Sequence, residues 1–493
     1  MRNRGALQTA GCVLCAIVTC AVSLGCRRPG PPPEITISGD AIFDGKRVRL
    51  VVAKGETIGF RVGHRKAAPV TLALPSLQAA IHTFAVERVR VKRSSTRLYG
   101  GGGSPGDYPD TLLPDRSPTS DPAFVEVAIP RDAAAGTHTG ELVVGDLPHV
   151  PVELEIVDVA LPELAPRVWA YYDPRELQWA NLGTGTHAAP SDEERACIAM
   201  FRGYGVMLSP DLPLDAWAAR RPLLDGFPYV PVKLSTDPVA ATVEVKSWIA
   251  ATKDTGHVPF AIPIDEPRGD GAWTRVATLA KAVRDAGGGP STFMYAVTDE
   301  PRREYGDLID LYIPLTPRKA DTFTRWTYNG APPRAGSFVL DAKPPGARTW
   351  GWLAHAWRIP VWYVWDALYW HDRHNRKGAP LPGRALVPAV DATSFDDGED
   401  HGNLDGVLSL PGDKATPCRP SLRLAAIRRG MQDRALLELA TACDAAATNA
   451  LVDDLIPAAL GDVDKRDFAH WPQNEAAWET ARRKLLALAS CKR

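Results

Sequence analysis

The sequence lacks an excess of charge of either sign. Its 493 residues include 57 Lys and Arg against 58 Asp and Glu, which leaves a formal net charge of −1. This balance argues against a nucleic-acid partner, because such binding rests on a basic surface that neutralises phosphates. With 45% hydrophobic and 23% charged residues, the composition is that of an ordinary folded protein, which argues against collagen-like, coiled-coil and wholly disordered chains.

Signatures of several catalytic and metal centres are also missing. Ser209 lacks the GxSxG elbow of serine hydrolases, and after residue 26 the chain has no CxxC pair. His371 and His374 lie three residues apart without an HExxH motif around them, so a surface loop is the preferred interpretation. The acidic run at 396–401 does not have the spacing of a calcium loop. We therefore predict no metal and no cofactor.

A long hydrophobic run occurs only at the start of the chain. Two arginines precede an apolar stretch at residues 6–24, and residues 1–26 are expected to be a secretory signal peptide. Residues 23–26, Ser-Leu-Gly-Cys, resemble the cleavage box of bacterial lipoproteins, in which Cys26 becomes the lipidated first residue. The alternative is a plain signal peptide with an incidental cysteine. We expect an extracytoplasmic protein, anchored to the membrane through a lipid at Cys26 or else secreted or periplasmic.

Four cysteines remain beyond this segment: Cys197, Cys418, Cys443 and Cys491. An even number in a chain bound for an oxidising compartment predicts disulfides. A bond between Cys443 and Cys491 would tie the last two predicted helices together, but the sequence leaves the pairing open.

The first expected domain, residues 34–160, follows a stiff Pro-rich linker at 27–33. Short alternating apolar stretches separated by Gly, Pro, Asp and Ser predict an antiparallel β-sandwich. Residues 94–120, which include four consecutive glycines at 100–103, are predicted to form a long loop.

The second expected domain, residues 165–415, alternates short apolar runs with segments of helical spacing. This alternation predicts a parallel sheet, and eight strands predict closure into a (β/α)8 barrel of the TIM type. The strands are expected at 168–172, 205–208, 229–233, 259–264, 292–297, 309–313, 323–328 and 361–365.

Clear helices are expected between these strands at 191–202, 239–252 and 272–285. A C-terminal helical extension at 416–493 carries two further amphipathic helices, at 421–441 and 476–489.

The most informative stretch is an apolar strand that ends in Asp265-Glu266-Pro267. Barrel enzymes build their sites at the carboxyl ends of the strands, so these carboxylates are the candidate catalytic residues. Neighbours in a regular strand point to opposite faces, and both can serve one pocket only if the strand breaks, as Pro267 favours. The alternative is that Asp265 caps the next helix and Glu266 is solvated.

A second acidic pair, Asp299-Glu300-Pro301, follows the fifth expected strand. Glu300 is a candidate second carboxylate of a two-carboxylate glycosidase. The preferred interpretation is a helix-start signal, since acidic residues and proline favour the first turn.

Aromatic residues are dense in the second half of the expected barrel. Six of the fourteen tryptophans lie between residues 350 and 370. Flat rings at a barrel mouth suit sugars, whose C–H faces stack on aromatic rings. The candidates for lining such a pocket are Trp326, Tyr328, Tyr363 and Trp365.

These elements together resemble the catalytic domain of glycoside hydrolase family 123. The resemblance rests on the order of several short segments: Ala128-Ile-Pro-Arg-Asp, Asp265-Glu-Pro267, Trp326-Thr-Tyr328, Trp350-Gly-Trp-Leu353, Trp357-Arg-Ile-Pro360, Trp362-Tyr-Val-Trp365, Asp405-Gly-Val-Leu-Ser-Leu-Pro-Gly412 and Arg429-Gly430. It spans most of the chain after the leader.

The resemblance implies an exo-acting β-N-acetylhexosaminidase, with N-acetylgalactosaminides as the family's substrate and a substrate-assisted retaining mechanism. Carried over, Glu266 is the general acid and base, and Asp265 stabilises the acetamido group of the substrate. Two alternatives stay open. One is a two-carboxylate glycosidase that uses Glu266 and Glu300, and the other is a non-catalytic, glycan-binding surface lipoprotein. The expected partner is in each case a glycan or glycoconjugate.

Overall fold

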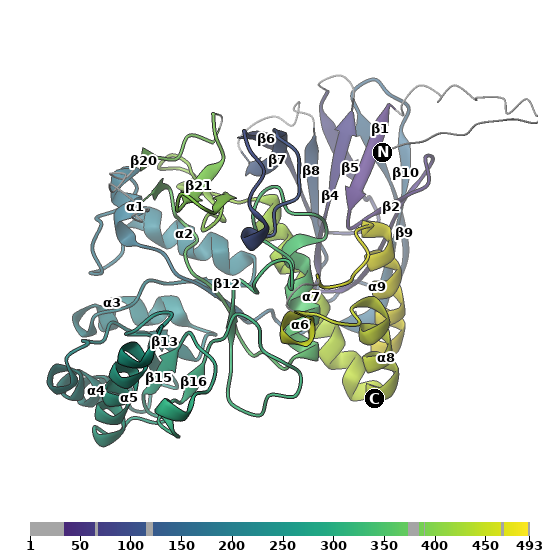
Figure 1. Cartoon of the computed structure of the whole chain (residues 1–493). Helices are drawn as coiled ribbons and strands as arrows, with labels where there is room; N and C mark the ends of the chain where they lie inside the picture. Colours follow the sequence, from purple (N-terminus) through teal and green to yellow (C-terminus); the bar gives the residue numbers. More distant parts are fainter. Residues whose placement is uncertain are drawn as a thin grey trace, which may run out of the picture. The chain divides into compact units, whose positions relative to one another are not determined.

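The computed structural model describes residues 34–64, 68–114, 122–372, 384–388, 390–464 and 468–491 (Figure 1). The expected signal peptide, the lipidation candidate Cys26, the linker at 27–33 and His374 lie outside these residues. Within the described part, no helix has the length and apolar character needed to span a membrane.

Two five-stranded sheets form the first part of the described chain. One sheet has the strand order β1 (Ile35–Gly39), β4 (Thr57–His64), β8 (Ala123–Ala128), β6 (Ala80–Val91), β7 (Gly106–Leu113). The other has the order β2 (Ile42–Phe43), β3 (Val48–Lys54), β10 (Val150–Ala160), β9 (Gly136–Val144), β5 (Val70–Ala73). Alternate residues of β3 and β4, such as Val48, Leu50, Ile58 and Phe60, are buried in one core that both sheets share, as a period of two requires.

The pairing in the second sheet is not wholly antiparallel, in contrast to the expectation. Strand β10 pairs with β9 in antiparallel fashion but with β3 in parallel, with Val152 opposite Val48. Parallel neighbours need a long connection, and here the strands from β4 to β9 supply it.

The glycine run at 100–103 also differs from the expected loop. The preceding residues form a short 3-10 helix, η1 (Arg97–Tyr99), and β7 follows from Gly106 to Leu113. A Cβ atom on Gly101 would lie 2.0 Å from the backbone oxygen of Ser95, and one on Gly103 would lie 2.2 Å from the hydroxyl of Tyr108. The glycines therefore allow close packing of the backbone, where the sequence suggested only flexibility.

Eight parallel strands follow, one at each range expected from the sequence. They are β11 (Val168–Ala170), β12 (Val206–Leu208), β13 (Tyr229–Pro231), β14 (Val258–Ala261), β15 (Met294–Val297), β16 (Leu311–Tyr312), β17 (Thr327–Tyr328) and β18 (Trp362–Val364). Their ladders form two four-stranded sheets, in the orders β12-β11-β18-β17 and β13-β14-β15-β16, and not one continuous closed ladder. Isolated parallel bridges, Leu212 with Val232 and Tyr312 with Arg325, join the edges of the two sheets.

Helices alternate with these strands, and Figure 1 shows α4 and α5 beside β13, β15 and β16. The helices are α1 (Pro174–Trp179), α2 (Asp192–Gly203), α3 (Trp217–Arg220), α4 (Pro238–Thr252), α5 (Asp270–Asp285) and α6 (Thr349–Ala356). Side-chain caps fix several starts: Ser191 accepts from the backbone of Glu194 in α2, and Asp237 accepts from Val239 and Ala240 in α4.

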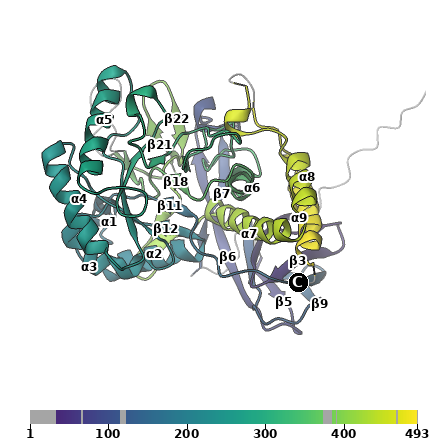
Figure 2. The ribbon, with the colours of Figure 1, turned by 90° about the horizontal axis from the view of Figure 1, so that it is seen from below.

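The chain then forms short hairpins and three C-terminal helices. The hairpin strands are β19 (His371–Asp372), β20 (Arg384–Ala385), β21 (Thr393–Asp396), β22 (His401–Asn403), β23 (Leu410–Pro411) and β24 (Cys418–Arg419). The helices are α7 (Leu422–Cys443), α8 (Ala445–Leu455) and α9 (Glu475–Ala489). Figure 2 shows α7 with α6 and α9 next to it.

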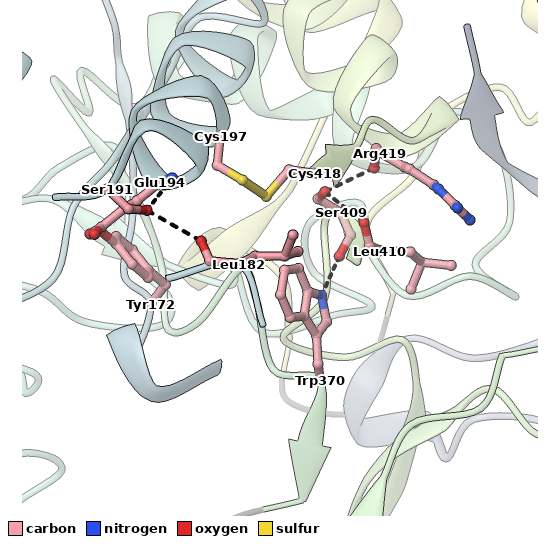
Figure 3. Close-up of a disulfide and its surroundings, with 10 residues drawn as sticks. All are labelled: Tyr172, Leu182, Ser191, Glu194, Cys197, Trp370, Ser409, Leu410, Cys418 and Arg419. Atoms are coloured by element: carbon pink, nitrogen blue, oxygen red, sulfur yellow. Dashed lines mark hydrogen bonds between the residues drawn. A yellow bond between two sulfur atoms is a disulfide. The ribbon is translucent and has the colours of Figure 1, made fainter. Parts of the chain in front are cut away.

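Two disulfides connect distant parts of the chain. Cys197 of α2 bonds Cys418 of β24, and beside this bond the indole of Trp370 donates to the backbone oxygen of Ser409 (Figure 3). Cys443, at the end of α7, bonds Cys491, so the pairing that ties the last two predicted helices together is formed.

Buried charges surround α7, which was expected only as an amphipathic helix of an extension. We call the α7 network the following side chains: Asp40, Glu56, Arg348, Arg429, Asp433, Glu479 and Arg482. Nε of Arg429 lies 3.1 Å from Oδ1 of Asp40, and Nη1 of Arg429 also pairs with Glu56. Both acids lie in turns of the N-terminal sheets, so ion pairs of Arg429 connect α7 to those sheets.

Asp433 forms the other half of the network. Its carboxylate lies 3.1 Å from Nε of Arg348 and 2.8 Å from Nε of Arg482 in α9. Burial by itself would raise the pKa of Asp433, but Arg348, Arg482 and Arg429 outweigh it and hold this pKa below the usual range. By their contacts, residues Ile35–Arg493 form one compact unit.

We predict that Arg429→Met lowers the free energy of unfolding by about 3–5 kcal/mol, because it leaves buried carboxylates without their partner. Urea unfolding followed by circular dichroism measures this loss. Arg47→Met is the matched control, since the ion pair of Arg47 with Glu153 is exposed. Equal, small losses in the two variants would contradict the structural role of the network.

Candidate functional site

The candidate carboxylates lie on a turn beyond the end of β14. The strand ends at Ala261, earlier than the sequence suggested, and Glu266 has a φ of 41°. A positive φ is unfavourable for a residue with a side chain, and such strain persists only where neighbouring contacts hold it. The break in the strand allows Asp265 and Glu266 to serve one site.

Thr298, just after β15, holds this turn. Its buried hydroxyl accepts a hydrogen bond from the backbone N–H of Glu266 at 2.6 Å and donates one to Oδ1 of Asp265 at 2.7 Å. One hydroxyl therefore fixes both the strained backbone and the orientation of the aspartate. Asp265 does not cap the next helix, because the cap residue of α5 is Gly269.

The carboxylate of Glu266 has two side-chain donors. The hydroxyl of Tyr328 donates to Oε1 at 2.7 Å, and Nη2 of Arg268 donates to Oε2 at 3.0 Å. Arg268 is exposed, so its ion pair contributes little to stability. Burial, followed by the charge of Glu266, raises the pKa of Tyr328, so the phenol remains a donor at neutral pH.

Asp265 is an exposed residue, although protein atoms surround part of its carboxyl group. Its surface is open to solvent, so a ligand can reach it. Burial around its carboxyl raises the pKa of Asp265, and the negative charge of Glu266 adds to this rise, while the hydrogen bond from Thr298 opposes it.

The aromatic candidates divide into two groups. Tyr363 lies near the carboxylates: its ring is 6.1 Å from that of Tyr328 and stacks on Trp169 at 4.3 Å. Trp326, however, is 1% exposed and packs edge-on against Phe260 at 4.9 Å. It lies two residues before Tyr328 on the same face, about 7 Å deeper in the strand, and therefore belongs to the core beneath the site.

Trp365 contacts a different segment. Its ring lies 4.9 Å from Tyr369 and 6.0 Å from Phe395, and its indole donates to the buried carboxyl group of Asp405. These contacts give it a packing role at the hairpin segments that follow β18.

The second acidic pair is placed in two environments. Asp299 accepts hydrogen bonds from Nη2 of Arg302 at 2.8 Å and from the hydroxyl of Tyr305 at 2.6 Å, at the start of η4 (Arg303–Tyr305). Glu300 is exposed. Asp299 thus binds the side chains of Arg302 and Tyr305 but does not cap η4, whose N-cap is Arg302 without a side-chain hydrogen bond, so the expected helix-start role is not seen.

Three functional candidates were missed in the sequence: Thr298, Asp211 and Lys233. Each follows the end of a parallel strand, β15, β12 or β13. The only signal was a single polar residue after an apolar run, which is too common to identify a site. Burial raises the pKa of Asp211 to about 7, with Lys233 lowering it and the nearby charge of Asp265 raising it.

No grouping of three or more His, Cys, Asp or Glu side chains suited to a metal ion occurs among the residues that the structure describes.

Comparison with solved structures shows the fold. No family model matches the sequence, and no curated protein matches it. A family 123 glycoside hydrolase from Clostridium perfringens, studied for glycolipid glycan hydrolysis, is similar in fold with a TM-score of 0.60. The alignment covers 92% of this chain and 97% of that chain at 11% identity. The chain thus has a mixed α/β fold like that of this glycoside hydrolase.

Two other glycoside hydrolases show much weaker similarity. One is a family 5 xyloglucanase from Bacteroides ovatus, with a TM-score of 0.25 and 9% identity over 80% of this chain and 99% of that chain. The other is a family 2 member from Bacteroides cellulosilyticus, with a TM-score of 0.26 and 12% identity over 64% of this chain and 44% of that chain. Scores this low do not show a shared fold.

The stability of the protein should depend on pH through the buried carboxyl group of Asp405, to which Trp365 donates. Burial raises the pKa of Asp405 to about 7, against hydrogen bonds from Trp365 and from the backbone of Gly406. The folded protein keeps this proton up to about pH 7, whereas the unfolded chain loses it near pH 4. The contribution of Asp405 to the free energy of unfolding is therefore lost as the pH rises from about 4 to about 7.

We predict that the free energy of unfolding of the wild type falls relative to that of Asp405→Asn between pH 4 and pH 8. The relative fall should be at least about 1.4 kcal/mol, the equivalent of one pKa unit. Urea titrations of both proteins at the two pH values measure it. A constant difference between them would show that Asp405 titrates normally.

Proposed function

We propose that the protein is a glycoside hydrolase that acts on β-linked N-acetylhexosaminides, N-acetylgalactosaminides in particular, by a substrate-assisted retaining mechanism. The observation that carries this proposal is the pair of adjacent carboxyls, Asp265 and Glu266, presented on one strained turn and held by Thr298. The fold that the chain shares with a family 123 enzyme supports it.

In the first step, Glu266 donates a proton to the glycosidic oxygen as the bond to the anomeric carbon breaks. The carbonyl oxygen of the substrate's 2-acetamido group attacks that carbon from the other face and forms an oxazolinium ion. Asp265 accepts the acetamido N–H, whose positive character grows in the transition state. Tyr328, which donates to Glu266, stabilises the carboxylate left after the proton has moved.

In the second step, Glu266 takes a proton from water, and the resulting hydroxide opens the oxazolinium ion at the anomeric carbon. The sugar is released with its configuration retained, and Glu266 is protonated again. Adjacent carboxyls suit this chemistry because one addresses the glycosidic oxygen and the other the acetamido group. A two-carboxylate mechanism instead needs a second carboxylate across the sugar, whereas Asp265 and Glu266 are presented side by side on one turn.

The architecture around this site is part of the proposal. We infer that the eight strands β11 to β18 act as one (β/α)8 barrel at 165–415, between a β-sandwich at 34–160 and a helical extension at 416–493. The two isolated parallel bridges at the sheet edges support this closure. Export and lipidation at Cys26 remain proposals from the sequence.

We predict that Glu266→Gln lowers kcat on 4-nitrophenyl β-N-acetylgalactosaminide by about 10²–10⁴-fold, because the amide cannot supply a proton. Absorbance of the released nitrophenol measures the rate. Glu300→Gln is the matched control and should retain wild-type activity. Loss in the Glu300 variant, with activity towards a β-galactoside, would favour the two-carboxylate mechanism instead.

Thr298→Val should lower kcat by about 10²-fold with little change in KM, because loss of the hydroxyl frees the strained turn and misplaces both carboxyls. Thr298→Ser keeps the hydroxyl and should restore most of the rate. Thr278→Val, which removes a hydroxyl bonded only to its own helix, is the control. If valine and serine variants behaved alike, the role of the Thr298 hydrogen bonds would be refuted.

A further inference from the structure

Pro267, the residue that follows Glu266, is held by a tryptophan of the next helix. The indole N–H of Trp273, in α5, donates to the backbone oxygen of Pro267 at 3.1 Å. Proline has no backbone N–H, so this oxygen is the one backbone group through which a hydrogen bond can hold it. Pro267 is buried, whereas Glu266 is exposed and has a φ of 41°. The bond therefore fixes the chain immediately after the strained residue.

The ring of Trp273 is in turn covered by a cation. Cζ of Arg302 lies 4.3 Å from the centre of the ring, within the range of a cation–π interaction. Asp299 orients this guanidinium, because Nη2 of Arg302 donates to Oδ1 of Asp299 at 2.8 Å and Nε donates to Oδ2. The hydroxyl of the buried Tyr305 donates to the same Oδ2 at 2.6 Å. These bonds hold the arginine in the place where it contacts Trp273.

The segment after β15 thus reaches the acidic turn, residues 265–267, in two ways. Thr298 binds the turn directly, through the backbone N–H at its middle residue. Asp299, the next residue, acts through Arg302 and Trp273 on the carbonyl at the end of the turn. Strained backbone persists only where the surrounding structure over-determines it, and one contact on each side of the strained φ does so here.

We propose that Trp273 and Arg302 are positioning residues for Glu266, which together hold the acidic turn in the conformation that presents its carboxyl to the glycosidic oxygen. This inference rests on the proposed function and adds to it two side chains from outside the turn. It also gives a role to the second acidic pair, since Asp299 orients Arg302.

The first test removes the indole N–H and keeps an aromatic ring. Trp273→Phe should lower kcat on 4-nitrophenyl β-N-acetylgalactosaminide by about 10–100-fold and change KM by less than about threefold, because a misplaced acid weakens the transition state more than substrate binding. Trp478→Phe is the matched control, since Trp478 also donates to the oxygen of the proline six residues before it, Pro472, at 2.7 Å. Figures 1 and 2 show its helix, α9, apart from α5, and this variant should keep the wild-type kcat.

The second test removes the cation. Arg302→Met should lower kcat by about 3–10-fold, and Arg302→Lys, which keeps a positive charge, should recover part of this loss. Because the arginine acts through Trp273, the variant that combines Arg302→Met with Trp273→Phe should lose less than the product of the two single losses. Arg303→Met is the control, since the side chain of Arg303 is 95% exposed, and it should behave as the wild type. Losses that multiply in the combined variant would contradict a shared action on the turn.

Hydrogen–deuterium exchange gives a readout that does not depend on turnover. The backbone N–H of Glu266 is bonded to Thr298, so a peptide that contains residues 262–269 should exchange faster in Trp273→Phe than in the wild type, and at the wild-type rate in Trp478→Phe. Thermal unfolding establishes that each variant is folded.

Wild-type kcat and wild-type exchange in Trp273→Phe would overturn the inference, while loss of activity in Glu266→Gln would leave the proposed function standing. A wild type that does not hydrolyse the sugar would instead end the proposed function. In that case, equal exchange in the two proteins would show that Trp273 does not hold the turn, and faster exchange in Trp273→Phe would support its hold on Glu266.

Discussion

Charge pairing inside the protein, around helix α7, is the constraint on which the rest of the structure depends. The helix carries Arg429 and Asp433, both almost fully buried, and their partners come from the N-terminal sheets and from α9. Desolvated charges are costly unless each has a partner, so every segment that supplies one must be in place. The network therefore joins the N-terminal sheets, helices α7 and α9 and the segment at Arg348. These parts belong to the same compact unit as the parallel strands that carry the site.

The site itself depends on a smaller constraint of the same kind. The hydroxyl of Thr298 accepts a hydrogen bond from the backbone N–H of Glu266 and donates one to the side chain of Asp265. Two adjacent carboxyls on a strand would otherwise face opposite sides. Burial, and after it the charge of Glu266, raises the pKa of Asp265. Proton transfer and recognition of an acetamido group need this combination of fixed geometry and neighbouring charge.

Part of this could be predicted from the sequence. The eight parallel strands and the turn at Asp265-Glu266 were located, because apolar runs and a terminal Pro267 are local signals. Trp326 was expected to line the pocket but is buried, since a sequence does not show how deep in a strand a ring lies. Asp211 and Thr298 were missed because each is a single polar residue whose neighbours are distant in the chain. The helix at 421–441 was expected only to be amphipathic, and only the fold shows the partners of its buried charges.

The most direct test of substrate assistance changes the nucleophile that the substrate itself supplies. The rates on 4-nitrophenyl β-N-acetylgalactosaminide should be compared with those on the mono-, di- and trifluoroacetamido analogues, because fluorine makes the carbonyl oxygen less nucleophilic. If the acetamido oxygen is the nucleophile, kcat falls steeply with each added fluorine. Rates that do not change along this series, at full activity on the parent, would contradict it and point to a nucleophile provided by the protein.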